Sequence, residues 1–299
     1  MRLDGERESS NIDDRRGDGG GGGGIPFIGG GGIGIGAIVI AVIGGLIFHI
    51  NPLVLLGIMN GGGGGGSGTV QQAPPNHPVR SVGGAEEPEV KFVRQVLAST
   101  EDTWGALFQQ QGGQYRQPTL TLFRGQTRTG CGQGQAAMGP FYCPSDEHVY
   151  IDLAFYDTLK SQLGSPGDFA QAYVVAHEVG HHVQKLMGIS EKVDAARQRG
   201  SEAQSNALSV RLELQADCFA GVWAFHANQT RHILEAGDME EALNAASQIG
   251  DDTLQKKARG TVVPETFTHG TSAQRVGWFK RGFDTGQVAQ CDTFKSATP

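Results

Sequence analysis

Hydrophobic and polar residues are distributed unevenly along the chain, most sharply in its N-terminal part. Residues 1–24 begin with a charged stretch almost free of apolar side chains and end in consecutive glycines. Residues 33–48 contain no polar side chain, and a second apolar stretch follows at residues 53–59. Because a bilayer span needs about 20 apolar residues, we expect one transmembrane segment over residues 25–59, preceded by a disordered tail over residues 1–24.

A cleaved secretory signal is the alternative interpretation of residues 25–59. Against it, the apolar region begins late, is too long and lacks a cleavage site of small residues. Four arginines lie within residues 1–16, before the segment, and the next basic residue after it is Arg80. Basic residues flank the cytoplasmic end of a span. We therefore expect a single-pass protein with its N-terminus in the cytoplasm and the rest of the chain outside.

The pattern changes again after the apolar segment. Residues 60–88 are rich in glycine and then in proline, without hydrophobic periodicity, as expected of a linker. Residues 89–299 are long enough for one domain with its own core. Alternating apolar residues predict strands over residues 119–123 and 148–152, and most other segments favour helices. The predicted fold is α+β and mostly helical, with a small sheet.

Capping signals delimit two of the predicted helices. The residues SPGD at positions 165–168 indicate a helix that starts with Ser165 as N-cap and ends before Gly188. The residues SEAQ, beginning at Ser201, form a capping box that starts a second helix. The strand at residues 148–152 precedes the first of these helices. It lies either at the edge of the sheet, where an extended peptide can pair with it, or inside the sheet.

Charge and composition narrow the classes of function. The net charge is -7, and no cluster of Lys and Arg occurs. The chain therefore lacks the electrostatic footprint of a nucleic-acid-binding protein. Glycine accounts for 47 residues, and most of the excess lies before residue 90.

The four cysteines, Cys131, Cys143, Cys218 and Cys291, all lie in the predicted outer domain. An even number outside the membrane suggests disulfides, for which three connectivities exist. Cys131 and Cys143 bracket a glycine-rich loop and are the expected pair, and Cys218 with Cys291 then follows by elimination. Four reduced thiols in a cytosolic protein are the alternative, which would require the opposite topology.

The strongest chemical signal is YVVAHEVGHHVQ, in which His177, Glu178 and His181 match the pattern H-E-x-x-H. Two histidines four residues apart lie on one face of a helix and can bind one Zn²⁺ ion. Glu178 lies beside this pair, within reach of a water molecule on the metal, and would act as general base. Two histidines buried in an ordinary core are the alternative, but that arrangement would leave Glu178 buried without a partner, which is costly.

A third ligand is expected on the second helix, within LELQADCFAGVW. Glu213 and Asp217 are four residues apart on one helical face among apolar neighbours, where two carboxylates are costly unless each has a partner. We expect Glu213 to bind the zinc ion and Asp217 to accept a hydrogen bond from a ligating imidazole. An exposed acidic stripe is the alternative, which the apolar neighbours oppose.

These motifs resemble those of zinc peptidases of the gluzincin type, which combine H-E-x-x-H with a downstream E-x-x-x-D. More closely, AHEVGHHVQ, ELQADCFAGVW and THGTSAQRVGWFKRGFDTG resemble the neutral zinc metallopeptidase family of bacteria. The likeness covers nearly the whole chain. It implies a zincin-like fold and a bacterial inner-membrane protein with its catalytic domain on the periplasmic side, and it supplies no substrate.

Three further residues are placed by the same reasoning. The segment THGTSAQR puts His269 just before a helix capped by Thr271 or Ser272. Resemblance to membrane-associated gluzincins implies that His269, or less readily Arg275, stabilises the oxyanion formed at a peptide carbonyl. Alternatively, His269 fixes the loop and Arg275 pairs with an acid. His182 points away from His177 on the helix and is interpreted as packing.

The sequence thus predicts a membrane-anchored zinc endopeptidase that acts on a peptide or protein, attached to the bilayer by one span. Two alternatives stay open. One is a zinc-stabilised scaffold in the cell envelope without turnover, and the other is a zinc hydrolase that cleaves a non-peptide amide. An intact general base beside an open metal position favours an enzyme over a scaffold.

Overall fold

The computed structural model describes residues 1–17, 87–136, 139–161 and 167–296. The predicted transmembrane segment, residues 25–59, and nearly all of the predicted linker lie outside these ranges. Among the described residues, no helix combines the length and apolar character needed to cross a membrane.

The main sheet has four strands in the order β1-β2-β6-β5. β1 (Ile12–Asp14), β2 (Thr119–Phe123) and β6 (His148–Asp152) run parallel, and β5 (Phe141–Cys143) runs antiparallel to β6. A separate hairpin consists of β3 (Gln126–Thr129) and β4 (Gly132–Gln135). The predictions for β2 and β6 are confirmed. Of the two alternatives for β6, the internal position is the one observed, and β5 is the edge strand next to it.

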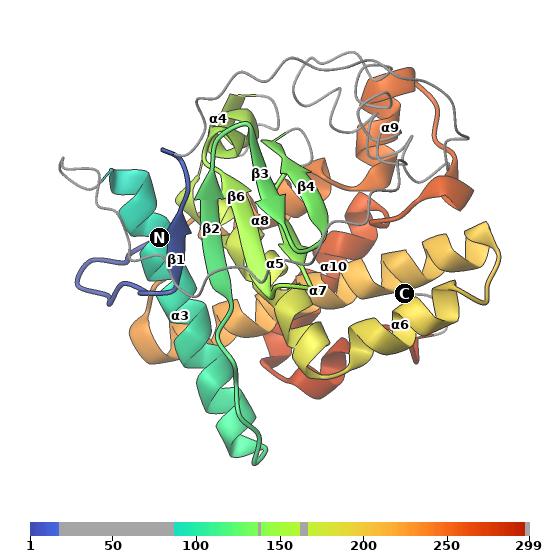
Figure 1. Cartoon of the computed structure of the whole chain (residues 1–299). Coiled ribbons are helices and arrows are strands. Elements are labelled where there is room, and N and C mark those ends of the chain that lie inside the picture. Colours follow the sequence, from blue (N-terminus) through green and yellow to red (C-terminus); the bar gives the residue numbers. More distant parts are fainter. Residues whose placement is uncertain (18–86, 137–138, 162–166, 297–299) are drawn as a thin grey trace, which may run out of the picture.

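Helices make up most of the described fold and pack against one face of the sheet (Figure 1). The α+β, mostly helical prediction is therefore confirmed. The helices are α3 (Pro88–Gln110), α4 (Ala154–Ser161), α5 (Asp168–Leu186), α6 (Ile189–Arg197), α7 (Glu202–Arg231), α8 (Asp238–Gln248), α9 (Asp251–Arg259) and α10 (Ser272–Thr285). Two short 3-10 helices, η2 (Pro264–Thr266) and η3 (Val288–Cys291), flank α10.

Helix starts agree with the capping signals at two of three places. Ser201 and Gln204 form the predicted capping box of α7, and Thr271 is the N-cap of α10. The predicted N-cap Ser165 is wrong, because α5 begins at Asp168 with Gly167 as its N-cap. At the other end of α5, Gly188 adopts φ 67°, a conformation that glycine accepts without steric cost.

The core fills the space between the sheet and helices α3, α5 and α7. Trp104 of α3 meets Phe219 of α7 edge to face, with ring centroids 5.4 Å apart. Phe169 of α5 stacks on Trp223 of α7 with centroids 6.0 Å apart. These large rings are almost fully buried, so they hold the helix pair α5 and α7 at a fixed spacing.

Helices α7 and α10 approach closely because glycines face each other across their contact. A Cβ atom at Gly221 would overlap the backbone oxygen of Phe279, and one at Gly282 would overlap the backbone oxygen of Cys218. Only the absence of side chains permits this backbone-to-backbone packing. It brings residues of α10 near the carboxylates of α7.

Residues 1–17 belong to the folded domain, so the prediction of a disordered tail over residues 1–24 is wrong for this part; residues 18–24 lie outside the described residues. β1 pairs in parallel with β2, with Ile12 opposite Leu120. Leu3 and Ile12 are buried in the same core as the helices. The low apolar content suggested disorder. Backbone pairing with β2 and the burial of Leu3 and Ile12 nevertheless hold this segment in the fold.

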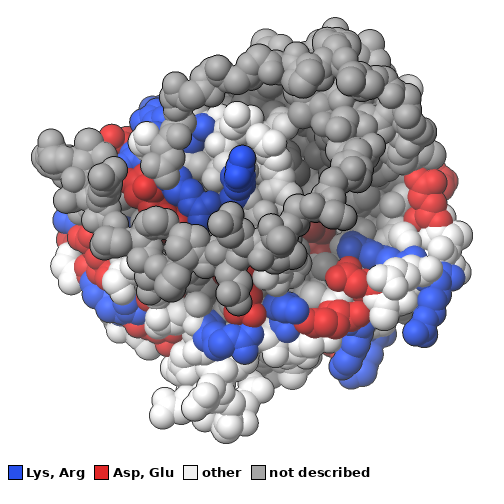
Figure 2. Space-filling model, in the orientation of Figure 1, with Lys and Arg blue, Asp and Glu red and all other residues white. Residues whose placement is uncertain are grey.

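The charges of this segment are paired within the domain. Arg7 lies 2.9 Å from Glu101 and 2.6 Å from Asp102, and Arg16 lies 2.5 Å from Glu87. Basic and acidic side chains also lie close together elsewhere on the face shown in Figure 2. Arg7 and Arg16 of the N-terminal segment therefore form ion pairs with acidic residues of the domain.

Candidate metal centre

The structure brings the three predicted metal ligands together at the contact between α5 and α7. His177 Nε2 lies 3.2 Å from one carboxylate oxygen of Glu213, and His181 Nε2 lies 3.5 Å from the other. One ligand atom from each of these residues lies within 4.8 Å of the other two. The i,i+4 spacing on α5 and the close packing of α7 thus produce a compact set of two nitrogens and one carboxylate.

Both imidazoles are oriented through their other nitrogen. His177 Nδ1 lies 2.8 Å from Asp217 Oδ1, and His181 Nδ1 lies 2.9 Å from Gln184 Oε1. The Gln184 amide is itself fixed, because its Nε2 donates to the carbonyl oxygen of Leu212 at 2.7 Å. Nδ1–H therefore donates in each ring, which directs both Nε2 atoms toward Glu213.

Asp217 stands at the centre of a buried polar network. Its two oxygens accept hydrogen bonds from Arg275 Nε and Nη2, both at 2.9 Å, and from the Tyr173 hydroxyl at 2.5 Å. Burial acts to raise the pKa of Asp217, but Arg275 and His177 outweigh it and hold this pKa at about 2. Asp217 is thus an anion that fixes His177 and is in turn held by α10.

The donor set fits a zinc ion in chemistry and in charge. Zinc is bound in proteins by imidazole nitrogen and carboxylate oxygen, and catalytic sites use three protein ligands. Burial acts to lower the pKa of His177, yet interactions with Asp217 and Glu213 raise it to about 10. The carboxylates thus favour positive charge at the point where the ligand atoms converge.

A cleft of about 410 Å³ opens over these residues. Its lining includes apolar side chains of three elements, among them Phe155, Val174 and Leu212, together with residues of β5. Glu178 reaches the same cleft while remaining buried, and burial raises the pKa of its carboxyl group. A carboxylate with an elevated pKa beside a metal site has the properties of a general base.

His269 lines the cleft from the loop before α10. Its Nδ1 lies 3.3 Å from Asp251 Oδ1. The other oxygen of Asp251 accepts hydrogen bonds from the backbone nitrogens of Thr268, His269 and Gly270, at 2.7, 2.6 and 3.0 Å. The fully buried Asp251 thus fixes both the loop and the ring that the loop carries.

Arg275 is 2 % exposed and donates hydrogen bonds to Asp217. Of the two alternatives for Arg275, pairing with an acid therefore agrees with the structure. Two histidines at the C-terminal end of α7 lie away from this cluster. His226 Nε2 donates to the carbonyl oxygen of Gly286, and His232 is the C-cap of α7.

The sequence interpretation missed several contributors. The side chains that orient ligands or cleft residues include Tyr173, Gln184 and Asp251. Asp251 is 18 positions from its partner His269, and Tyr173 is 44 positions from its partner Asp217, so no local pattern indicates these contacts. The one sequence signal was the placement of Tyr173 and Gln184 on the same helix as the motif, one turn before and after it.

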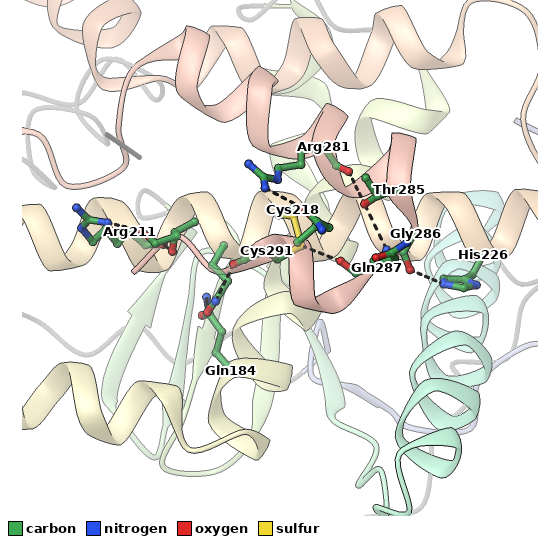
Figure 3. The surroundings of a disulfide bond; sticks show 12 residues. Gln184, Arg211, Cys218, His226, Arg281, Thr285, Gly286, Gln287 and Cys291 are labelled. Carbon is green, nitrogen blue, oxygen red and sulfur yellow. Dashed lines mark hydrogen bonds between the residues drawn. A yellow bond between two sulfur atoms is a disulfide. The ribbon is translucent and has the colours of Figure 1, made fainter. Parts of the chain in front are cut away.

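Both predicted disulfides are present. Cys131–Cys143 joins the turn between β3 and β4 to β5, and Cys218–Cys291 joins α7 to η3. Figure 3 shows the second bond, with Cys218 on the face of α7 that meets the C-terminal segment. Gln215 adds a hydrogen bond to the carbonyl oxygen of Cys291 at 2.9 Å. The segment around Cys291 is therefore fixed to α7, the helix that carries Glu213.

A helix that carries H-E-x-x-H, packed on a helix that supplies a carboxylate, is the arrangement of a zinc-dependent peptidase. Residues 1–294 match the model of the family described as "Putative neutral zinc metallopeptidase". The chain belongs to this family.

Several relatives are similar over much of their length. The YpfJ protein of Escherichia coli K-12, described as uncharacterized, is 52% identical over 298 residues, which cover 98% of this chain and 99% of YpfJ. The proteins Mb2605 of Mycobacterium bovis and Rv2575 of Mycobacterium tuberculosis, also described as uncharacterized, are each 42% identical over 217 residues, or 69% of this chain and 72% of the relative. No solved structure matches the chain.

Proposed function

We propose that this protein is a zinc-dependent endopeptidase that binds one Zn²⁺ ion through His177, His181 and Glu213. The orientation of the two imidazole rings is the main support for this proposal. Each imidazole donates its Nδ1–H to a fixed oxygen, so both Nε2 atoms face the Glu213 carboxylate at distances that suit a shared cation. Two histidines that merely filled a core would have no need of this paired orientation.

When bound, zinc supplies Lewis acidity, which lowers the pKa of a water molecule and polarises a peptide carbonyl. Glu178 has the remaining chemical role. From its place in the cleft it takes the proton of the attacking water and passes it to the leaving amine. Its raised pKa suits a group that must both accept and return a proton.

His269 is proposed to stabilise the negative charge that develops on the carbonyl oxygen. Burial acts to lower the pKa of His269, but Glu213 and Asp251 outweigh it and raise this pKa. A raised pKa favours the cationic ring, which is the form that stabilises an oxyanion. Asp251 is a positioning residue in this scheme, because it acts through His269 and the loop.

A peptide is the substrate class that the cleft suits best. β5 lines the cleft and is an edge strand, so its free backbone groups can pair with an extended chain. We propose in addition that residues 25–59 attach the protein to the bacterial inner membrane and that the catalytic domain lies outside the cytoplasm. The two disulfides support this, because such bonds persist in oxidising compartments.

Replacement of Glu178 tests the proposal. Purified E178Q should retain one zinc ion per chain and lose peptide hydrolysis by about 10²-fold or more, measured with a quenched fluorescent peptide library. The control is E202Q, an exposed acid in the first turn of α7, which should behave like the wild type.

Undiminished cleavage by E178Q would contradict the mechanism. Zinc binding by the wild type without cleavage of any peptide would favour the non-catalytic scaffold, and cleavage of other amides alone would favour a non-peptide hydrolase.

A further inference from the structure

The edge strand β5 contacts the metal-binding helix α5 through the side chain of Tyr142. The hydroxyl of Tyr142, the middle residue of β5, lies 3.0 Å from His182 Nδ1. On the other side of the ring, His182 Nε2 lies 2.6 Å from the carbonyl oxygen of Arg116. A carbonyl can only accept, so Nε2 carries the proton and Nδ1 accepts from the Tyr142 hydroxyl.

His182 is fully buried, and the same helix presents its neighbour His181 to the metal centre. The rings of Tyr115 and Tyr142 pack against it edge to face, with centroids 5.7 and 5.5 Å away. Successive histidines of α5 therefore serve the metal site and the strand beside it.

We propose that Tyr142 and His182 are positioning residues that hold β5 in register with the metal centre, so that a bound peptide is presented to Glu178. The inference rests on the proposed function, since it concerns how the same cleft binds its substrate. Neither residue acts on the scissile bond. Their loss should weaken peptide binding and leave zinc binding intact.

Y142F tests this inference, because it removes the hydroxyl and keeps the ring. Y115F is the matched control, because the Tyr115 ring packs against the same histidine and its buried hydroxyl, among the described residues, has no hydrogen-bond partner. Y142F should raise KM by about five- to tenfold with little change in kcat, the effect of about one hydrogen bond. Zinc affinity should stay unchanged, and Y115F should match the wild type.

A second readout separates this inference from the proposed function. Amide hydrogen exchange at residues 141–143 should be faster in Y142F than in Y115F, whether or not any peptide is cleaved. Equal exchange in the two variants, or an equal rise in KM, would overturn the proposed positioning role of Tyr142 and His182. If the wild type cleaves no peptide while exchange differs as expected, only the proposed function fails.

An independent observation concerns the topology of the chain. The described residues stop at residue 17 and resume at residue 87, and these two ends are in contact through the ion pair of Arg16 and Glu87 at 2.5 Å. β1 is hydrogen-bonded to β2 over three residue pairs. Arg7, Arg15 and Arg16, which entered the charge argument for a cytoplasmic N-terminus, are all bound to carboxylates.

We infer that residues 1–17 and the metal-binding domain lie on the same side of any membrane that the chain meets. A single crossing between residues 17 and 87 would place about 30 Å of hydrocarbon between β1 and β2. This inference replaces the expected arrangement, in which the N-terminus is cytoplasmic and the domain is external. The arginines contribute to folding and do not report orientation.

Cysteine labelling in the full-length protein tests this inference. S10C and Q109C each place a thiol at an exposed position, one before residue 17 and one in α3, while the four native cysteines are in disulfides. A membrane-impermeant maleimide should label both variants in intact spheroplasts, or neither until the membrane is permeabilised. Labelling of one variant in intact spheroplasts and of the other only after permeabilisation would overturn the inference.

Discussion

At the residue scale, the surroundings of Glu213 and Asp217 assign different roles to two carboxylates on one helical face. Glu213 faces the Nε2 atoms of both histidines, whereas Asp217 contacts Nδ1 of one and is held by Arg275. The i,i+4 spacings were sufficient to predict that His177, His181 and Glu213 converge and that Asp217 contacts an imidazole. From the sequence, pairing of Arg275 with an acid was one of two alternatives. The acid could not be identified as Asp217, because 58 positions separate the two residues.

The two carboxylates should differ in their effect on zinc affinity. E213A removes a proposed ligand and should nearly abolish zinc retention. D217N keeps the size and one acceptor oxygen, so zinc should bind about 10–100-fold more weakly. Competition with a chelator at fixed pH measures both. Complete loss of zinc in D217N would show that the two roles have been exchanged.

C218S is the neighbouring control on α7. It should keep the zinc affinity of the wild type, although loss of the disulfide to Cys291 should lower the free energy of unfolding by about 2–5 kcal/mol. Zinc loss in C218S comparable to that in E213A would indicate that unfolding, and not ligand removal, explains the series.

At the element scale, the position of α10 against α7 decides whether Arg275 can reach Asp217. A capping box predicted where α7 begins, and the Thr271–Ser272 pair predicted the start of α10 to within one residue, since capping depends on residues close in sequence. The contact itself depends on Gly221 and Gly282, whose partners lie on the other helix. No local pattern indicates which glycines of a helix face another backbone.

Two glycines of α10 should respond with opposite sign to the same substitution. At Gly282 a Cβ would overlap the backbone of α7, so G282A should lower the free energy of unfolding by about 1–3 kcal/mol or more. At Gly277 a Cβ would meet nothing within 4 Å, so G277A should raise it by up to about 1 kcal/mol. Chemical denaturation measures both, and equal destabilisation would contradict the packing described.

At the scale of the whole molecule, the N-terminal segment completes a sheet whose other strands lie more than 100 positions away. Composition alone suggested disorder for this segment, because it cannot show that a distant strand offers a free edge. The same pairing is the basis for our inference that residues 1–17 and the metal-binding domain lie on one side of a membrane. The two main strands of that sheet were predicted, since their alternation is local.

Ile12 provides a direct test of this role, because it is 5% exposed and opposite Leu120. I12A should lower the free energy of unfolding of the whole domain by about 2–5 kcal/mol. The exposed neighbour Ser10 is the control, and S10A should change it by less than about 0.5 kcal/mol. An unchanged transition in I12A would mean that residues 1–17 are not part of the cooperative unit.

The central claim is that His177, His181 and Glu213 form a zinc site, and anomalous diffraction at the zinc absorption edge tests it most directly. Crystals of the purified protein should show one peak, about 2.0–2.2 Å from both Nε2 atoms and from a Glu213 oxygen. A second acidic group, Asp168, Asp238 and Glu241, also has ligand atoms within 4.8 Å of one another and serves as an internal comparison. A peak at that group alone, or no peak between the two histidines and Glu213, would contradict the account.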